Sequence, residues 1–454
     1  MLRRVVAGVS GAGIKGQLLR AGAGGLGVRI LSLFATLLSS VVLARVLGDS
    51  GYGLYAFALS VTALLALPVQ VGVPILVIRE TSSAEAARDW AALHSIRTWA
   101  LRVNWLFGLL IVAAVLLFAW AAGERISTST RHVLFLAVAL ILPVALSSTL
   151  GATLRGLRRV MAGLYPGEVV RPVLISALVG ASALVWADSI GPETALLLNL
   201  AATLLVLGLL IVLVRRALPA DSRGELALAF KTGPWLKSLL PLAMMSSLHL
   251  VNQNTDMVML GLFRDAAEVG YYKIAVSGAG FVIFGLSAIQ VVAMPYVSRF
   301  FSGREHDRLQ RLAAACAGAS TLLALPVIGI YLLWGRELLA FVYGETFVAS
   351  WGPLLILSGA QLVNGFFGIV WPLLVMTGHE RAGFRGLAIA TVVNVGLNAA
   401  LIPAWGAAGA ALATGISILI WNLLFWLAVR RYLDIDGSVL GLLRWGRAGK
   451  APGA

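Results

Sequence analysis

The stretch TALLLNLAATLLVLGLLIVLV, residues 194–214, has no charged side chain in 21 consecutive positions. An α-helix rises about 1.5 Å per residue, so this stretch is long enough to cross the roughly 30 Å hydrocarbon layer of a bilayer. Its apolar residues are continuous and do not alternate with polar ones, which favours a helix over a strand of a membrane barrel. The stretch therefore predicts a transmembrane helix.

The rest of the chain has the same character. Its 454 residues are 59% hydrophobic and 12% charged, with a mean hydropathy of +0.92. A soluble domain is closer to 45–50% apolar and about 25% charged, so one soluble core cannot bury this excess. We predict an all-α polytopic membrane protein with about twelve transmembrane helices. The predicted spans are 26–47, 53–78, 101–122, 132–154, 168–187, 194–214, 238–262, 269–298, 311–333, 352–376, 385–403 and 407–429.

The net charge of +15 raises the question of a nucleic-acid partner. With a cytoplasmic N-terminus and twelve alternating spans, most Arg and Lys residues fall on the inner face, as the positive-inside rule requires. The predicted outer face receives only Arg45, Arg125, Arg131, Arg264, Lys273 and Arg336. This asymmetry explains the basic composition without a polyanionic partner, and it predicts that both termini are cytoplasmic. The lone cysteine, Cys316, excludes an intrachain disulfide.

The chain contains an internal repeat. GDSGYGLYAFALS (48–60) and DAAEVGYYKIAVS (265–277) share Gly, Tyr, Ala and Ser at one constant offset, and VRRAL (214–218) corresponds to VRRYL (429–433). Six spans per half is an even number, so both halves insert in the same sense, and transporters built in this way bind substrate between the halves. We predict two pseudo-symmetric six-helix halves around a central cleft. The predicted segments are an N-terminal segment 1–25, the halves 26–214 and 238–430, a cytoplasmic linker 215–237 and a basic tail 431–454.

Polar residues interrupt the seventh predicted span, MMSSLHLVNQNTDMVMLGLF (244–263). His249, Asn252, Gln253 and Asp256 follow helical spacing and share one face. An ionisable residue at membrane depth usually faces the bundle interior or a wet cavity. We therefore expect Asp256 and His249 to line the cleft, although interhelical hydrogen bonding is the alternative for such residues.

Further polar residues lie inside other predicted spans. Arg29 heads a polar stripe on the first span, and Arg171 follows Glu168 by three residues, a spacing that permits an ion pair. Asn394 and Asn398 are one turn apart on the eleventh span, while Arg45 lies near the outer end of the first. We predict no catalytic or metal-binding residues, because the sequence contains no metal cluster, nucleophile–base pair or phosphate-binding loop.

Four segments, in order, resemble the Wzx-like polysaccharide-biosynthesis flippases of the multidrug/oligosaccharidyl-lipid/polysaccharide superfamily, whose fold is MATE-like. They are RVLGDSGYGLYAFALS (45–60), VGYYKIAVSGAGFVIFGLSAIQVVAMPYVSRF (269–300), GRELLAFVYGETFVASWGPLLILSGA (335–360) and NVGLNAALIPAWGAAGAALATGIS (394–417). The resemblance covers essentially the whole chain. It implies transport of undecaprenyl-pyrophosphate-linked oligosaccharide from the inner to the outer leaflet of the bacterial inner membrane by alternating access.

Such a cargo carries an anionic pyrophosphate and a polar glycan, neither of which crosses hydrocarbon alone. Under this resemblance Arg29, Arg45 and Arg171 are the expected phosphate partners, because guanidinium groups bind phosphate bidentately. Asn252, Asn394 and Asn398 suit sugar hydroxyls. Asp256 and His249 are expected to carry a coupling proton or to help bind Na⁺. Membrane lipids, and a glycan polymerase or glycosyltransferases, are the expected partners, with no cofactor and no nucleic acid.

Two alternatives remain open at this point. A cation-coupled multidrug exporter of the same superfamily would share the fold, and a membrane-embedded glycan polymerase or ligase would be an enzyme. The cationic residues in the spans favour an anionic cargo over a cationic drug. The predicted outer loops are short, with about 334–351 the longest, which favours a transporter over a polymerase with a large catalytic loop.

Overall fold

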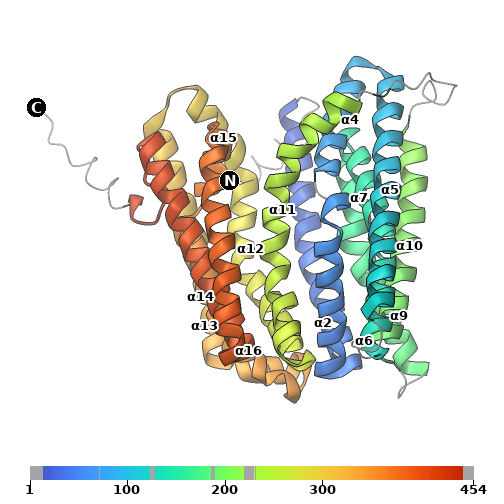
Figure 1. Ribbon diagram of the computed structural model, residues 1–454. Coiled ribbons are helices and arrows are strands. Elements are labelled where there is room, and N and C mark those ends of the chain that lie inside the picture. Colours follow the sequence, from blue (N-terminus) through green and yellow to red (C-terminus); the bar gives the residue numbers. More distant parts are fainter. Residues whose placement is uncertain are drawn as a thin grey trace, which may run out of the picture. The chain divides into compact units, whose positions relative to one another are not determined.

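The computed structural model describes residues 14–70, 72–122, 128–185, 190–218, 230 and 232–442, and these residues form helices and short connections with no β-strand among them (Figure 1). The chain divides into two compact units, residues 1–254 and 255–454, and the division falls inside α11. The first unit contains α2 (Ile14–Leu65), α3 (Leu67–Gln70), α4 (Val73–Ala87), α5 (Trp90–Ala122), α6 (Thr128–Ala139), α7 (Ile141–Gly156), α8 (Val160–Tyr165), the π-helical turn η2 (Pro166–Val170), α9 (Arg171–Val185), α10 (Pro192–Ala217) and the first part of α11 (Thr232–Phe263). The second contains the rest of α11, α12 (Ala266–Ser302), α13 (His306–Tyr343), the 3₁₀ turn η4 (Glu345–Ser350), α14 (Trp351–Phe367), α15 (Val370–Met376) and α16 (Glu380–Leu433).

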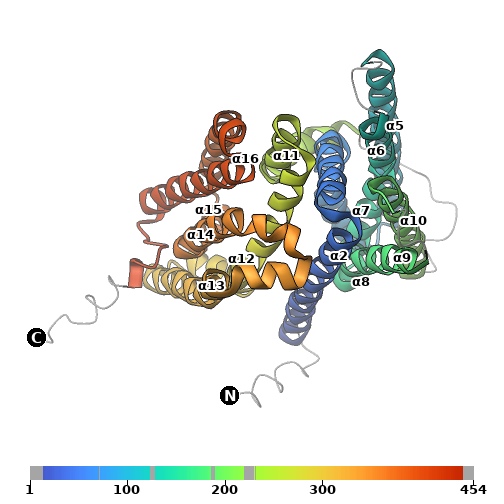
Figure 2. The same cartoon turned by 90° about the horizontal axis from the view of Figure 1, so that it is seen from below.

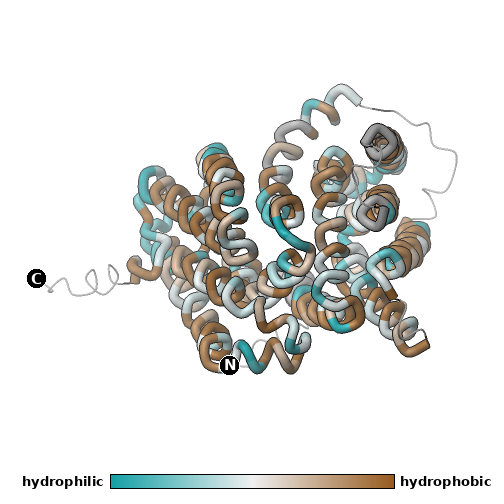
Figure 3. Tube along the Cα trace, turned by 60° about the horizontal axis from the view of Figure 1, so that its bottom comes forward, coloured by the Kyte–Doolittle hydropathy of each residue, from teal (hydrophilic) through white to brown (hydrophobic). Residues whose placement is uncertain are grey.

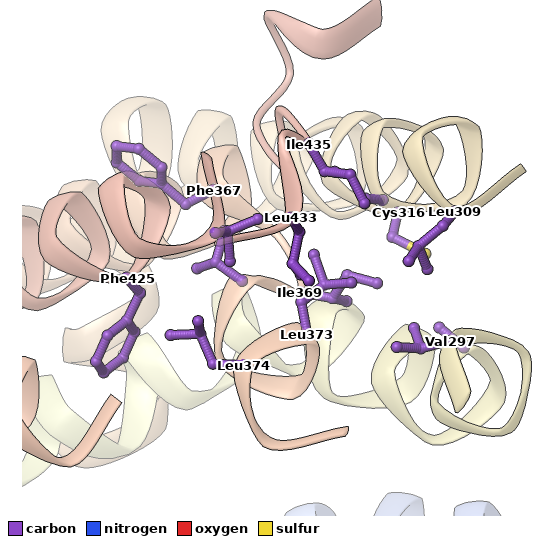
Figure 4. Packing of buried hydrophobic residues seen from close by; sticks show 14 of the residues in the cluster. Val297, Leu309, Cys316, Phe367, Ile369, Leu373, Leu374, Phe425, Leu433 and Ile435 are labelled. Atoms are coloured by element: carbon purple, nitrogen blue, oxygen red, sulfur yellow. The ribbon is translucent and has the colours of Figure 1, made fainter. Parts of the chain in front are cut away.

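Each unit is a bundle of helices packed side by side. In the first unit α7 packs against α4, α5 and α10, and α2 packs against α9 (Figure 2). In the second unit α14 packs against α12, α13 and α16. Buried apolar side chains from these helices form one core cluster, in which Phe367 and Phe425 lie near one end, Ile369 and Leu373 lie in the middle, and Cys316 lies close to Leu309 (Figure 4). The thiol of Cys316 is buried and free.

Hydrophobic residues run along most of the length of the helices (Figure 3). Leu117, Leu333 and Phe341 expose 65%, 68% and 80% of their surfaces, which a soluble protein rarely tolerates over so many positions. Within the described residues, nine helices are long and apolar enough to cross a membrane. They are Gly27–Leu65, Trp90–Leu117, His132–Gly156, Val160–Val185, Pro192–Ala217, Ala266–Ser302, His306–Tyr343, Glu345–Phe367 and Glu380–Leu433. The protein is therefore a multi-pass, all-α membrane protein, as the sequence predicted.

The count of twelve spans remains a prediction, because some predicted spans are merged and others are divided. Gly48 (φ 68°) breaks α2 and Gly406 (φ 53°) breaks α16, each just beyond the predicted end of one span. Only glycine adopts such a conformation without a steric cost, so these two positions act as chain turns between helices. The predicted span 53–78 was wrong in its continuity, because Pro68 and Gly72 (φ 81°) divide it into the end of α2, α3 and α4.

The break in α16 is held by side chains from the α11–α12 corner. Arg264 Nε donates to the carbonyl oxygen of Ile402 at 3.3 Å, and Glu268 Oε2 accepts from the amide of Ala407 at 2.6 Å. The first contact satisfies a carbonyl before the break, and the second satisfies an amide after it. A Cβ at Gly406 would collide with the Glu268 carboxylate, so glycine is required there for space as well as for its φ angle.

The internal repeat is visible in local structure. Ser60 Oγ donates to the carbonyl of Ala56 at 2.9 Å, and Ser277 Oγ donates to the carbonyl of Lys273 at the same distance. Both acceptors are four residues before their donors, and Ala56 and Lys273 are themselves equivalent under the repeat offset. The two segments therefore share hydrogen bonding as well as sequence.

Residues beyond α16 fold back onto the second unit. Asp436 pairs its backbone with the Gln310 side chain: its amide donates to Oε1 at 2.7 Å, and its carbonyl accepts from Nε2 at 2.8 Å. Its carboxylate accepts from Trp426 Nε1 at 2.9 Å and from Ser438 Oγ at 2.7 Å. Burial acts to raise the pKa of Asp436, but these hydrogen bonds and the charge of Arg430 outweigh it and hold that pKa below its usual value.

Candidate functional site

Asp256 lies in the second unit inside a cage of hydrogen-bond donors. Its side chain is buried on α11, with 3% of the residue exposed. Asn398 Nδ2 donates to Oδ1 at 2.6 Å, Tyr272 OH donates to Oδ2 at 2.8 Å, and Thr414 Oγ1 also donates to Oδ2. A carboxylate removed from water is stable only when its lone pairs are satisfied, and here donors from α12 and both parts of α16 satisfy them.

The local structure of α16 brings these donors together. Asn394 and Asn398 are one turn apart, and Asn398 Nδ2 also donates to Asn394 Oδ1 at 3.0 Å. The break at Gly406 turns the chain back, so that Thr414 faces the same carboxylate from the second part of the helix. Close packing of the two parts is possible because Gly409 lies against the backbone of Leu401, where a Cβ would collide with the carbonyl. The motif 394–417 thus supplies three of the groups in the cage.

The cage has the composition of a site for a proton or a hard cation. Its oxygen atoms come from one carboxylate, two hydroxyl groups and two amides, and the Asn398 Oδ1 atom has no hydrogen-bond partner among the described residues. Oxygen ligands of this kind suit hard cations and not zinc or copper. The part of the chain that the structure describes also contains no cluster of three His, Cys, Asp or Glu residues for a transition metal.

A second buried polar cluster lies in the first unit and carries a positive charge. Arg171 Nη2, at the start of α9, donates to Asn199 Oδ1 on α10 at 3.1 Å. Asn199 Nδ2 donates in turn to Tyr55 OH on α2 at 2.8 Å, and Thr203 Oγ1 donates to the Asn199 carbonyl at 2.7 Å. The amide of Asn199 therefore links the guanidinium to the tyrosine, and three membrane-spanning helices hold the cation.

The sequence spacing had suggested an ion pair between Glu168 and Arg171, but the two residues do not pair. Among the described residues the two form no ion pair, because η2 inserts a π-helical turn between α8 and α9 and changes the register of their side chains. The Glu168 side chain is exposed, and the charges that act on it are those of Arg29 and Arg155.

The other predicted site residues lie apart from these two clusters. His249 is exposed on α11, and its Nε2 shares a hydrogen bond with Gln253 Nε2 at 2.9 Å. Asn252 Nδ2 donates to the carbonyl of Leu248 at 3.1 Å, a bond within the same helix. Arg29 and Arg45 are both exposed on α2. Roles for these four residues therefore remain predictions.

Sequence reasoning missed the roles of Tyr55, Asn199, Tyr272 and Thr414. The available signal was the repeat, because Tyr55 and Tyr272 are its matched tyrosines and each lies at the centre of a cluster. An asparagine in the uncharged, mostly apolar stretch 194–214 was a second signal.

Comparisons with known proteins agree with this architecture. A profile of the family described as polysaccharide biosynthesis protein matches residues 25–301. The probable low-salt glycan biosynthesis flippase Agl15 of Haloferax volcanii is 26% identical over 165 residues, which is 36% of this chain and 35% of that protein. Stage V sporulation protein B of Bacillus subtilis is 28% identical over 168 residues, which is 37% of this chain and 31% of that protein. The chain thus spans about a third of the length of the curated relatives that it matches.

Two solved structures share the fold. An inward-facing multidrug resistance MATE family transporter of the MOP superfamily has a TM-score of 0.69 at 14% identity, covering 94% of this chain and all of that one. The lipid II flippase MurJ, in an inward closed conformation, has a TM-score of 0.67 at 16% identity and covers 94% of this chain and 93% of that one. At these identities the likeness shows the fold and nothing further.

Proposed function

Since the chain belongs to the polysaccharide biosynthesis protein family, we propose that it moves a lipid-linked oligosaccharide from the inner to the outer leaflet of the bacterial cytoplasmic membrane. In this proposal both termini are cytoplasmic, and the halves 26–214 and 238–430 alternate access around a central cleft. The linker 215–237 and the tail 431–454 lie on the inner face, as their arginines and lysines favour. The carrier lipid is undecaprenyl pyrophosphate, and the enzymes that build or polymerise the glycan are the expected partners.

One observation carries the proposal: Arg171 keeps a guanidinium inside a membrane-spanning helix bundle, where Asn199 holds it. A cation at membrane depth costs several kcal/mol and is usually retained for a charged substrate or a partner charge. The pyrophosphate of the cargo is such a substrate, and a guanidinium binds phosphate with two parallel hydrogen bonds. Arg29 and Arg45, exposed on α2, are proposed as further phosphate contacts, and Asn252 as a sugar contact.

We further propose that the Asp256 cage couples transport to an ion. A proton on Asp256, or Na⁺ among the cage oxygens, would neutralise the carboxylate and reorder the hydrogen bonds of Asn398, Tyr272 and Thr414. Because both parts of α16 contribute to the cage, ion binding would change the packing of that helix against α11 and α12. His249, bonded to Gln253, is proposed as an auxiliary proton carrier.

The proposal is tested by reconstituting the purified protein in vesicles with a short-chain lipid-linked oligosaccharide in the inner leaflet. A lectin added outside measures the arrival of the glycan. We expect transport above that of empty vesicles, with a dependence on a proton or sodium gradient. An equal rate in empty vesicles, or an equal rate with Arg171→Ala, would refute the proposed role of this site.

The alternative is a cation-coupled multidrug exporter, and the likeness to a MATE transporter is the observation in its favour. Cationic drugs are bound by acidic and aromatic walls, whereas the charge held in the first unit is positive. The same vesicles loaded with a fluorescent cationic drug distinguish the two functions. The relative Agl15 is described as a probable flippase and MurJ as a lipid II flippase, which also favours transport over a catalysed reaction.

A further inference from the structure

A cavity of about 210 Å³ lies inside the first unit, between α7, α8, η2, α9 and α10. Its polar lining consists of Ser147, Ser148, Arg155, Glu168, Arg171 and Thr203. About 10–15 Å³ of space open to the centre of a water-sized sphere is enough to hold one water molecule. This cavity therefore has room for a larger polar group.

Three hydrogen-bond donors in the cavity wall have no partner. The Nε atoms of Arg155 and Arg171 and the Oγ atom of Ser147 are buried and form no hydrogen bond with the residues that the structure describes. A buried donor without an acceptor costs about 1–3 kcal/mol, and more when it is charged. Guanidinium groups have donors only, so what completes this cavity must supply acceptor atoms.

The charge of the lining indicates which kind of acceptor fits. Arg155 and Arg171 contribute two positive charges, and Glu168 contributes one negative charge that also faces Arg29. The cavity therefore has a positive excess within a membrane-spanning bundle, which an anion would balance and a cation would worsen. Glu168 lies on the π-helical turn, a rare feature that is frequent at functional sites.

The entrance to the cavity is next to an apolar surface. Gly167 and Glu168, which line the cavity, are exposed, and Met161 and Tyr165 on the adjoining helix expose 49% and 42% of their surfaces. A lipid could place its headgroup among the arginines and its chains along these apolar residues. An isolated inorganic anion would leave that surface unused.

We propose that this cavity binds the phosphate group of an anionic membrane lipid, with Arg155, Arg171 and Ser147 as its donors. The phosphate belongs either to a phospholipid headgroup or to the carrier lipid of the cargo. In the second case the inference rests on the proposed function and adds Arg155 and Ser147 to the site of Arg171. Binding is measured without transport, so the two proposals can fail separately.

The test uses the purified full chain in detergent, with lipid binding measured by native mass spectrometry. The probes are phosphatidylglycerol, zwitterionic phosphatidylcholine and undecaprenyl pyrophosphate. We expect phosphatidylglycerol to bind at least tenfold more tightly than phosphatidylcholine, and Arg155→Gln to weaken that binding at least tenfold. Displacement of phosphatidylglycerol by equimolar undecaprenyl pyrophosphate would assign the cavity to the carrier lipid. A lack of displacement would assign it to the phospholipid.

Arg159→Gln is the matched control, because Arg159 is exposed at the end of the same segment and does not line the cavity. It should change phosphatidylglycerol binding less than twofold. The Nε atom of Arg155 forms no hydrogen bond with the described residues, so Arg155→Gln removes none at that atom and should keep its helical circular dichroism. Wild-type binding by Arg155→Gln would overturn the proposal. An equal loss in Arg159→Gln would also overturn it, since surface charge alone would then account for binding.

Discussion

Tyr55 and Tyr272 occupy equivalent positions in the internal repeat, and their hydroxyl groups serve clusters of opposite charge. Tyr272 OH donates to the carboxylate of Asp256, whereas Tyr55 OH accepts from Asn199, which in turn holds the guanidinium of Arg171. The same side chain at the same place thus acts as a donor to an anion in one half and as an acceptor beside a cation in the other. The repeat preserves the scaffold, and the charge has diverged.

The two tyrosines should differ in their contribution to stability. Tyr272→Phe removes a donor from a buried carboxylate, and we expect a loss of about 1–2 kcal/mol, since hydrogen bonds to charged groups are the stronger kind. Tyr55→Phe removes an acceptor from a neutral amide, and we expect a loss of about 0.6 kcal/mol, a typical value for an interhelical hydrogen bond between neutral groups in a membrane protein. Thermal unfolding in detergent measures both variants. A larger loss of stability for Tyr55→Phe than for Tyr272→Phe would contradict the assignment of Tyr272 as a donor to a charged group and Tyr55 as an acceptor from a neutral one.

Asp256→Asn should preserve the fold while removing the negative charge. The amide matches the carboxylate in shape, although one of its atoms can no longer accept from Tyr272 or Asn398. We expect at least a tenfold fall in transport and a loss of the response to a proton or sodium gradient. Asp265→Asn is the control, because Asp265 is exposed at the N-terminus of α12 and its side chain makes no capping hydrogen bond that the substitution could remove. Wild-type transport by Asp256→Asn with an unchanged ion response would leave only a packing role.

Arg171→Ala should abolish transport more completely than Arg171→Lys, and both variants should reach the membrane. Lysine keeps the charge but lacks the planar fork that binds phosphate and Asn199 together, so we expect partial rescue. Arg29→Ala should lower transport less, because Arg29 is exposed and Asn199 does not hold it. Vesicle assays normalised to the amount of inserted protein measure the transport rates of the three variants. Full activity of Arg171→Ala would remove the guanidinium from phosphate binding.

The predicted orientation can be measured with introduced cysteines in a Cys316→Ser background. Thr346→Cys, in the exposed turn η4, should react with an impermeant thiol reagent in intact cells. Ser83→Cys and Ser302→Cys, also exposed, should react only after the cells are opened. The predicted topology places residues 127 and 189 outside the cell and residue 222 inside it, so cysteines there would serve the same test. These three positions lie outside the described residues. Labelling of Ser302→Cys in intact cells would refute cytoplasmic placement of the α12–α13 connection.

Asp436 should make stability depend on pH in the acid range. Its pKa is lowered in the folded protein, so its stabilising contribution is complete above the ordinary carboxyl value of about 4 and disappears as the pH falls through the folded pKa. Asp436→Asn should reduce the melting temperature at pH 7 and make the melting curve less sensitive to pH between about 5 and 3. Asp434→Asn, next to α16 and without these contacts, is the control. An unchanged acid response in Asp436→Asn would assign the effect to other carboxylates.

The helical membrane fold could be predicted because hydrocarbon allows few solutions. Long apolar runs satisfy their backbone groups only as helices in a bilayer, so composition and run length were sufficient. Continuity was harder to predict, because Gly48 and Gly406 turn the chain within apolar stretches, and Pro68 with Gly72 divides another. Hydropathy averaged over many residues does not register a single residue with a positive φ angle.

The candidate site was predicted in part. Asp256, Asn394 and Asn398 were singled out separately, and the structure brings them into one cage, because Asn398 on α16 donates to both Asp256 on α11 and Asn394. His249 shared a helical face with Gln253 and Asp256 in sequence, and in the structure its hydrogen bond is with Gln253, one turn along the same helix. Arg155 was expected only as a positive charge at the inner face. Its position in a cavity depends on the turn between α7 and α8, which no local pattern encodes.

The cage around Asp256 also constrains how the chain enters the membrane during synthesis. Asn398 and Thr414, which donate to this carboxylate, are 142 and 158 residues further along the chain. A central aspartate costs about 2.5–3.5 kcal/mol when a helix partitions from the translocon into lipid. We therefore expect the α11 segment to enter lipid stably only after α16 has been synthesised and can supply these donors. Truncation of the nascent chain before residue 394 should leave α11 accessible to translocon crosslinkers, and extension beyond residue 414 should release it.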